Sequence, residues 1–144
     1  MVNIANKILL DKLINEVWNK GNLDVVNEVV ADRYTIHRDS GDPWEKQVLD
    51  HETFKQRVML ARNVFPDLQF IIDDYVCEDN KIAISWQYFG TQRGDVATLK
   101  GSDKKVLVSG LTIYFFESAK ITGHKQVLDR LGLFEQLGVK IGKQ

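Results

Sequence analysis

The residue types that most often carry chemistry are sparse in this chain. Its three histidines, His37, His51 and His124, stand far apart and form no pair at helical spacing, so they make a weak case for a metal site. The single cysteine, Cys77, excludes an internal disulfide and a zinc site built from several cysteines. From these residues we expect no bound metal.

Asp129 stands where a predicted strand, 121–129, meets a predicted last helix, 131–137. An aspartate at such a junction commonly caps the helix. Lys125 shares a strand face with Asp129 if the period of two holds. Four steps of ~3.3 Å keep their Cα atoms roughly 13 Å apart, too far for an easy ion pair. Lys125 is therefore either a pocket cation for an anionic ligand or a solvent-facing lysine at the rim.

Two further positions have a functional and a structural interpretation. His124 and Gln126 fall on the strand face opposite Asp129, where we expect a structural or interface role. His37 ends the first predicted strand, 33–37, just before a polar stretch, 38–44, that we interpret as a loop. It could line the mouth of a pocket, although a lone histidine is more often structural.

Apolar residues at helical spacing predict three helices in the first half of the chain. The first covers 8–18 and ends at Gly21, because a residue at this position usually needs the left-handed conformation. Asn22 can cap a short second helix that runs to Val30. A third helix begins after Asp50 and ends at Pro66. The apolar face of this third helix comprises Phe54, Val58, Ala61 and Phe65.

Everything after Pro66 is typical of extended chain. The predicted strands are 68–77, 82–91, 105–117 and 121–129, with tight turns at 78–81 and 118–120. Helices followed by antiparallel strands predict an α+β fold, in which a curved sheet carries helices on one side.

The strand at 105–117 is apolar on both of its alternating faces. Since a sheet that is open to water on one side should have a polar face, both faces should be covered. Helices can cover only one, so we expect a homodimer through the sheet; the alternative is a long loop over the second face.

Composition limits the class of protein further. A chain of 144 residues is expected to form one domain, 1–144, without a metal or disulfide staple. A net charge of −1 gives no basic excess for nucleic acid. No apolar run is long enough to span a membrane, and the N-terminus is unlike a signal peptide. We therefore expect a cytoplasmic protein without nucleic-acid or membrane partners.

Three segments carry a resemblance to a known family. They are Phe-Pro-Asp-Leu at 65–68, Gly-Thr-Gln-Arg-Gly at 90–94, and Asp-Arg-Leu-Gly-Leu-Phe-Glu-Gln-Leu-Gly at 129–138. In this order and at this spacing the chain resembles the SnoaL-like polyketide cyclases, also called ester cyclases, from about residue 8 to 139. The resemblance implies the NTF2-like fold: a cone made by a strongly curved antiparallel sheet, three N-terminal helices and a short C-terminal helix, with a pocket inside. It also implies a homodimer.

The resemblance implies a catalytic residue as well. In the characterised cyclases an Asp at the end of the last strand is the acid/base, and Asp129 matches it. That chemistry takes a proton from a carbon next to a carbonyl and needs no cofactor; a carboxylate in an apolar pocket gains base strength. Lys125 stands where members commonly carry an aromatic residue, and Gln92 where they commonly carry a histidine.

Inside such a cone, the concave face of the sheet forms both the core and the lining of the pocket. Trp86 and Tyr88 share one face of a central strand and are either core or ligand contacts. We expect Trp86, Tyr88, His37, Lys125, Phe65 and Phe54 to contact a small-molecule ligand.

Three functions remain open from the sequence. The first is a cofactor-free acid/base enzyme acting on a small carbonyl compound, polyketide-like or ester. The second is a module that binds a small hydrophobic ligand without turnover. The third is a partner-binding dimer with a vestigial pocket.

Overall fold

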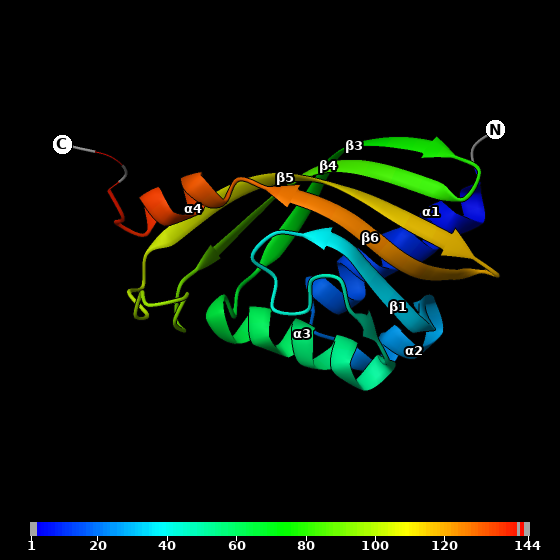
Figure 1. Ribbon diagram of the computed structural model, residues 1–144, viewed down its shortest axis with the longest axis horizontal. Coiled ribbons are helices and arrows are strands. Elements are labelled where there is room, and N and C mark those ends of the chain that lie inside the picture. The colour runs from blue at the N-terminus through cyan, green and yellow to red at the C-terminus, as the bar shows by residue number, and fades with distance from the viewer. Residues whose placement is uncertain (1–2, 141, 143–144) are drawn as a thin grey trace.

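A curved sheet of six strands, in the order β2-β1-β6-β5-β4-β3, forms one wall of the protein (Figure 1). The computed structural model describes residues 3–140 and 142. The strands are β1 (Val30–Asp39), β2 (Val48–Leu49), β3 (Gln69–Glu78), β4 (Lys81–Thr91), β5 (Lys105–Glu117) and β6 (Lys120–Leu128).

The helices of the first half of the chain lie against the concave face of this sheet (Figure 1). They are α1 (Ile4–Lys12), its π-helical continuation η1 (Leu13–Trp18), the 3-10 turn η2 (Leu23–Val25), α2 (Val26–Val29) and α3 (His51–Val64). A short last helix, α4 (Arg130–Gln136), follows β6 directly. The predicted α+β class with a curved sheet and helices on one side is confirmed.

Local signals explain where most helices begin and end. The Asp50 carboxylate accepts a hydrogen bond from the Thr53 amide at 2.8 Å and caps α3 as expected. Gly21 and Gly138 follow helices with positive φ angles of 72° and 99°, which glycine adopts without strain. The expected cap at Asn22 is wrong, because its side chain makes no capping hydrogen bond.

One strand departs from the expected antiparallel pattern. β1 pairs with β6 in parallel, whereas β6-β5-β4-β3 are antiparallel neighbours. The long connection through α3 and four strands gives the chain room to return in the same direction. Register shifts in β1, β3 and β6 mark irregularities of the kind that bends strands, and they accompany the curvature of the sheet.

β1 is also longer than the sequence indicates. The expected strand 33–37 extends to Asp39, although 38–44 has the composition of a loop. Asp39 is only 2% exposed, because its carboxylate is satisfied inside the protein. Interior partners therefore override a local signal that predicts a loop.

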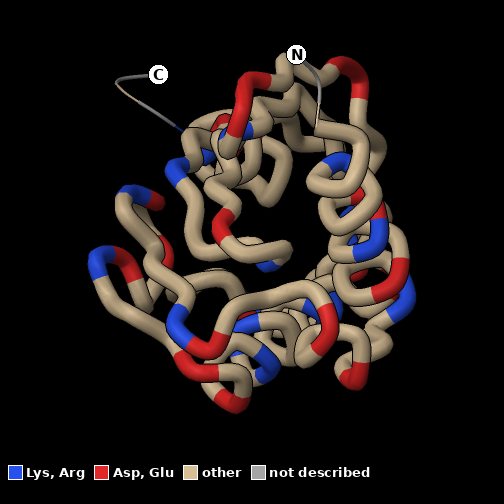
Figure 2. Tube along the Cα trace, turned by 90° about the vertical axis from the view of Figure 1, so that its right-hand side faces the viewer, with Lys and Arg blue, Asp and Glu red and all other residues tan. Residues whose placement is uncertain are grey.

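Charged residues leave no one-sided stripe on the face that Figure 2 presents, where Lys and Arg are interspersed with Asp and Glu. None of the helices in 3–140 has the length and apolar character needed to cross a membrane. The cytoplasmic location expected from the sequence stays a prediction.

The inner face of the sheet depends on a close contact between two strands. Trp86 of β4 lies opposite Gly110 of β5, and an ideal Cβ on Gly110 would lie 2.3 Å from the indole Cζ2. The missing side chain lets the indole lie flat across the neighbouring strand. The Trp86 ring is also stacked on the Tyr88 ring, with 5.9 Å between their centroids.

Gly110→Ala should therefore displace Trp86 and lower the free energy of unfolding by about 1–3 kcal/mol, the usual cost of overpacking. Chemical denaturation monitored by tryptophan fluorescence measures this loss. Ser109→Ala, at the exposed neighbouring position, is the matched control and should leave stability unchanged. An unchanged denaturation midpoint in Gly110→Ala would contradict the proposed packing.

Candidate functional site

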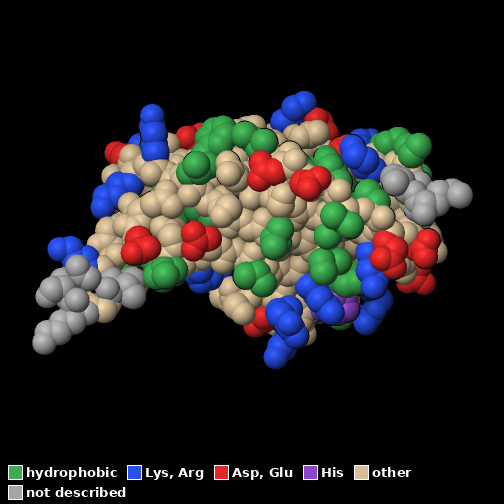
Figure 3. Space-filling view, turned by 90° about the horizontal axis from the view of Figure 1, so that it is seen from above, with side chains coloured by type: hydrophobic (Ala, Val, Ile, Leu, Met, Phe, Trp, Pro, Cys, Tyr) green, Lys and Arg blue, Asp and Glu red, His purple; other side chains and the backbone are tan. Residues whose placement is uncertain are grey.

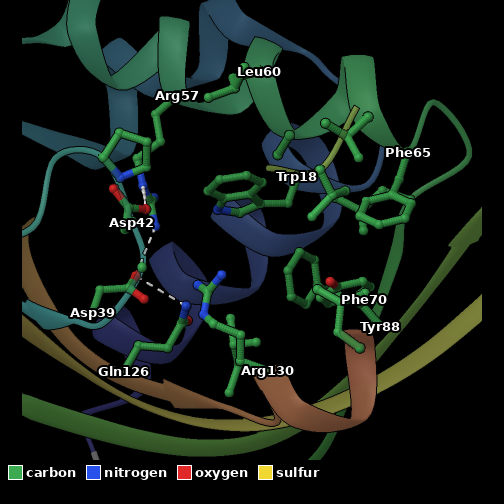
Figure 4. A pocket seen from close by; sticks show the side chains of 18 of the residues that line it. Trp18, Asp39, Asp42, Arg57, Leu60, Phe65, Phe70, Tyr88, Gln126 and Arg130 are labelled. Carbon is green, nitrogen blue, oxygen red and sulfur yellow. Dashed lines mark hydrogen bonds and ion pairs between the residues drawn. The ribbon is translucent and has the colours of Figure 1, made fainter. Parts of the chain in front are cut away.

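A cavity of about 420 Å³ lies between the concave face of the sheet and helix α3 (Figure 4). This volume falls within the range of small-molecule sites, about 300–1,000 Å³. Its walls come from η1, the segment after β1, α3, β3 to β6, the loop after β4 and the start of α4. Elements far apart in sequence therefore converge on one space.

One wall of the cavity is aromatic. The rings of Trp18, Phe65, Phe70, Trp86 and Tyr88 all line it. Phe70 stands edge-on to both Trp86 and Tyr88, at 5.1 and 5.4 Å between centroids, so these rings hold one another in place. Burial raises the pKa of Tyr88 to about 12, which keeps its phenol neutral. This wall suits a flat, apolar ligand.

The opposite end of the cavity is polar and centres on Asp39. One carboxylate oxygen, Oδ2, lies 3.2 Å from Arg57 Nη2, 2.8 Å from His124 Nε2 and 3.1 Å from Gln126 Nε2 (Figure 4). The three donors come from α3 and β6, whereas Asp39 ends β1. A buried charge of this kind is tolerated only when it is paired and hydrogen-bonded.

Arg57 is the cation of this polar end. Its Nε donates to Asp42 Oδ2 at 2.7 Å, and its Cζ lies 5.3 Å from the centroid of the Trp18 ring. Burial by itself lowers the pKa of Arg57, but the facing carboxylates of Asp42 and Asp39, with Tyr34, outweigh burial and raise it. Arg57 therefore stays charged and ties two carboxylates to helix α3.

His124 is held between two buried partners. Its Nε2 faces Asp39, and its Nδ1 lies 2.5 Å from the Tyr34 hydroxyl. Burial is the largest influence on His124 and lowers its pKa, while the hydrogen bond to Asp39 acts in the opposite direction. A neutral imidazole fits both contacts: Nε2–H donates to Asp39, and Nδ1 accepts from Tyr34, whose pKa burial raises.

A chain of hydrogen bonds links the aromatic wall to the polar end. The indole Nε1 of Trp86 donates to Thr112 Oγ1 at 2.8 Å, and that hydroxyl donates to Gln126 Oε1 at 2.7 Å. The Gln126 amide then donates to Asp39. The chain fixes the orientation of the Gln126 amide and so directs its N–H group at the carboxylate.

The second oxygen of Asp39 remains available. All three side-chain donors contact Oδ2, and Oδ1 has no hydrogen-bond partner among the described residues. Every fully buried side-chain oxygen or nitrogen of these residues has a hydrogen-bond partner, so Oδ1, which has none, keeps some accessible surface. Asp39 lines the cavity, and this oxygen is the one left for a ligand there. An anchored carboxylate with one free oxygen can accept a proton from a bound molecule.

The structure places Asp129 elsewhere. Its side chain is exposed, it does not line the cavity, and Oδ1 accepts a hydrogen bond from the Gly132 amide at 2.9 Å. The expectation that Asp129 faces into the cone is therefore wrong, whereas the interpretation as a helix cap is confirmed. The reason is strand register: His124, Gln126 and Leu128 line the cavity, so the alternate positions face outward.

The same register moves two predicted ligand contacts out of the cavity. Lys125 and His37 are exposed on the outer face, where each lies near the ring of Phe115. Phe54 is completely buried between Trp18 and Tyr34 and does not line the cavity. The expected positions of these three residues at the pocket are therefore wrong.

The structure supports the predicted positions of the aromatic residues more closely. Trp86, Tyr88 and Phe65 line the cavity as expected, and their contact with a ligand stays a prediction. Asp39 and Arg57 were missed by sequence reasoning. His124 and Gln126 lie on the face opposite Asp129, as expected, but this face and not that of Asp129 lines the cavity. One feature of the sequence could have indicated the cavity face of β6. Gln126 and His124 pair with Thr112 and Tyr114 of β5, so these four residues lie on one face of the sheet.

Gln92 has a structural role at the edge of the cavity. It is 1% exposed, its amide donates to Leu99 O at 3.2 Å, and its Oε1 accepts from the Ser102 hydroxyl at 2.6 Å. The loop that these bonds hold places 95–97 on the cavity wall. The glutamine thus shapes the loop and does not itself line the cavity.

His124 predicts a specific dependence of stability on pH. Its pKa in the folded protein lies below the unfolded value of about 6.5, so below pH 6.5 the unfolded chain binds a proton that the folded protein excludes. The free energy of unfolding should fall by up to about 1.4 kcal/mol per pH unit between pH 6.5 and 5. Urea denaturation across this window measures the slope.

His124→Asn should flatten that slope, and His37→Gln, at an exposed histidine, should keep it. If the variant at 124 does not fold, NMR titration of the His124 ring in the wild-type protein gives the same test. A ring that titrates at or above pH 6.5 would contradict the buried, neutral assignment.

Comparison with known proteins identifies the family. The family model of the SnoaL-like polyketide cyclases matches residues 8–137. A candidate polyketide cyclase from Acidithiobacillus ferrooxidans is 34% identical, with a TM-score of 0.86 over 92% of this chain and 94% of its own. TsrD from Streptomyces laurentii shares the fold at 21% identity, with a TM-score of 0.81 over 96% and 98%. No curated protein matches the chain. The chain belongs to the SnoaL-like polyketide cyclase family.

Proposed function

We propose that this protein is an acid/base enzyme that closes or isomerises a small carbonyl-containing compound, polyketide-like or ester, without a cofactor. Asp39 is the proposed base. The observation that carries this assignment is its free oxygen, Oδ1, open to an aromatic cavity while three donors hold Oδ2. The family membership supports the same class of reaction.

In the proposed reaction, Asp39 first removes a proton from the substrate and later returns it. Asp39 Oδ1 takes a proton from a carbon next to a carbonyl; the C–H electrons form an enolate. The enolate carbon attacks a second carbonyl of the same molecule, a C–C bond forms, and that carbonyl oxygen becomes an alkoxide. The proton on Asp39 then passes to the alkoxide, which regenerates the carboxylate.

Two features of the cavity favour this chemistry. The hydrogen bonds to Oδ2 fix the plane of the carboxylate, so Oδ1 needs no reorganisation before it accepts a proton. The rings of Trp86, Tyr88 and Phe70 provide flat apolar surfaces against which a conjugated carbonyl compound can pack. The low polarity of this wall also strengthens the interaction between the carboxylate and a nearby acidic C–H group.

Asp39→Asn should abolish most proton abstraction, because an amide of the same size cannot accept the proton. The expected loss is about 10²–10⁴-fold, the usual contribution of one acid/base group. Deuterium exchange at the carbon next to the carbonyl, followed by NMR in D₂O for 2-tetralone and a panel of aromatic keto esters, measures the rate above buffer.

Asp129→Asn is the matched control, since it makes the same change at the exposed cap of α4 and should keep the rate. Thermal unfolding and binding of the same ketones must show that each variant is folded with its cavity intact. If Asp129→Asn loses the exchange rate and Asp39→Asn keeps it, then Asp129, which stands at the family's catalytic position, is the base and Asp39 is not. Binding of the ketones by the wild-type protein without any exchange would favour a ligand-binding module.

We also propose that the protein is a homodimer through the outer face of the sheet. This face carries exposed apolar side chains at Ile71, Phe89, Leu107, Leu111, Ile113 and Val127. Figure 3 looks onto the sheet from outside and shows hydrophobic side chains spread across it. A two-fold interface would bury this surface on both copies at once.

Light scattering at micromolar concentration should give about twice 16.5 kDa. Leu111→Asp places a charge in the proposed interface on both copies and should yield a monomer. Met59→Asp, at an exposed apolar position of α3, is the control and should remain dimeric. A wild-type monomer over the whole concentration range would disprove the dimer.

A further inference from the structure

One charged group of the cavity has no ion-pair or hydrogen-bond partner among the described residues. The side chains of Asp39, Asp42, Asp95, Arg57 and Arg130 are the charged groups that line it. Arg130, the first residue of α4, forms no ion pair or hydrogen bond through its side chain with any residue in 3–140. It reaches from the end of β6 into the cavity, between Gln126 and Phe70 (Figure 4).

Each acidic residue of the cavity pairs with a cation other than Arg130. Asp39 and Asp42 share Arg57, and Asp42 Oδ1 also accepts from the Trp44 amide at 2.8 Å. Asp95 accepts from the Gly101 amide at 3.1 Å and lies 3.4 Å from Lys100 Nζ. The Arg130 guanidinium is therefore the cationic group of the described cavity that is left for a ligand.

This guanidinium lies close to the backbone of Gly41. An ideal Cβ on Gly41 would lie 2.4 Å from Arg130 Cζ and 2.6 Å from Nε, so the group lies directly against the backbone of the turn after β1. Gly41 has a φ angle of +90°, which favours glycine and keeps this space open. On its other side, Arg130 is close enough to Tyr88 to oppose the rise in the pKa of that phenol.

We propose that Arg130 binds a negatively charged group, a carboxylate in the simplest case, on an aromatic ligand that fills the cavity. The planar guanidinium can hold a carboxylate through two parallel hydrogen bonds, and Lys cannot reproduce that geometry. The aromatic wall then receives the rest of the ligand. The inference rests on the proposed function only in that the cavity holds a small molecule, and it narrows the substrate class to acidic aromatic compounds.

Matched probes that differ in charge alone test this assignment. 2-Naphthoate and 2-naphthamide have nearly the same shape, and quenching of tryptophan fluorescence or calorimetry reports their binding. The wild-type protein should bind the naphthoate more tightly. Arg130→Gln should weaken naphthoate binding about 10- to 100-fold, the contribution of charge-assisted hydrogen bonds, and leave the naphthamide unchanged. Arg130→Lys should restore only part of the difference.

Arg33→Gln is the matched control, because it removes the same charge from an exposed position of β1. It should leave both affinities unchanged. Equal binding of the two probes by the wild-type protein, equal weakening of both by Arg130→Gln, or an equal effect of Arg33→Gln would each overturn the assignment. The probes do not react, so the result is independent of whether Asp39 acts as a base.

Discussion

The buried carboxylate of Asp39 is the interaction on which the interior of this protein depends. It joins the end of β1 to α3 through Arg57 and to β6 through His124 and Gln126. Removing one partner of such a group would leave a charge without compensation in the protein interior, which is strongly unfavourable. The group therefore sets how the sheet, the helix and the turn after β1 meet.

The same group divides the cavity into two chemically different halves. Its donors crowd one oxygen of Asp39 and leave the other free, while the rings of Phe70, Trp86 and Tyr88 form the facing wall. Trp86 belongs to both halves, because its indole N–H begins the hydrogen-bond chain through Thr112 to the Gln126 amide. The packing of Trp86 in the aromatic wall therefore affects the orientation of the Gln126 amide, which in turn holds the Asp39 carboxylate.

Side chains point alternately to the two faces of the sheet along each strand. This alternation produces both the cavity and the apolar outer face. On β5, Val106, Val108 and Tyr114 are buried, and Leu107 and Leu111 are exposed. The strand is apolar on both sides because one side closes the core and the cavity while the other is a broad apolar surface. A cavity and a candidate assembly surface therefore lie back to back on the same strands of the sheet, formed by alternate residues.

The sequence by itself determined the class of fold and most of its elements, but neither β2 nor the full length of β1. Apolar periodicity, the cap at Asp50 and the glycines at 21 and 138 are local signals, and they predicted helices and strands close to the observed bounds. The motif at 129–138, with its neighbours, was sufficient to identify the family. The aromatic lining at Trp86 and Tyr88 also followed from alternation along one strand.

Only the tertiary structure decided which carboxylate faces the cavity. Asp129 and Asp39 both stand at strand ends, and the local sequence does not show which of the two faces inward. Strand register sends Asp129 outward to cap α4, while β1 continues past a segment of loop-like composition so that Asp39 can meet donors from α3 and β6. Those donors are 18 and 85 residues away along the chain, and only folding brings them to one oxygen.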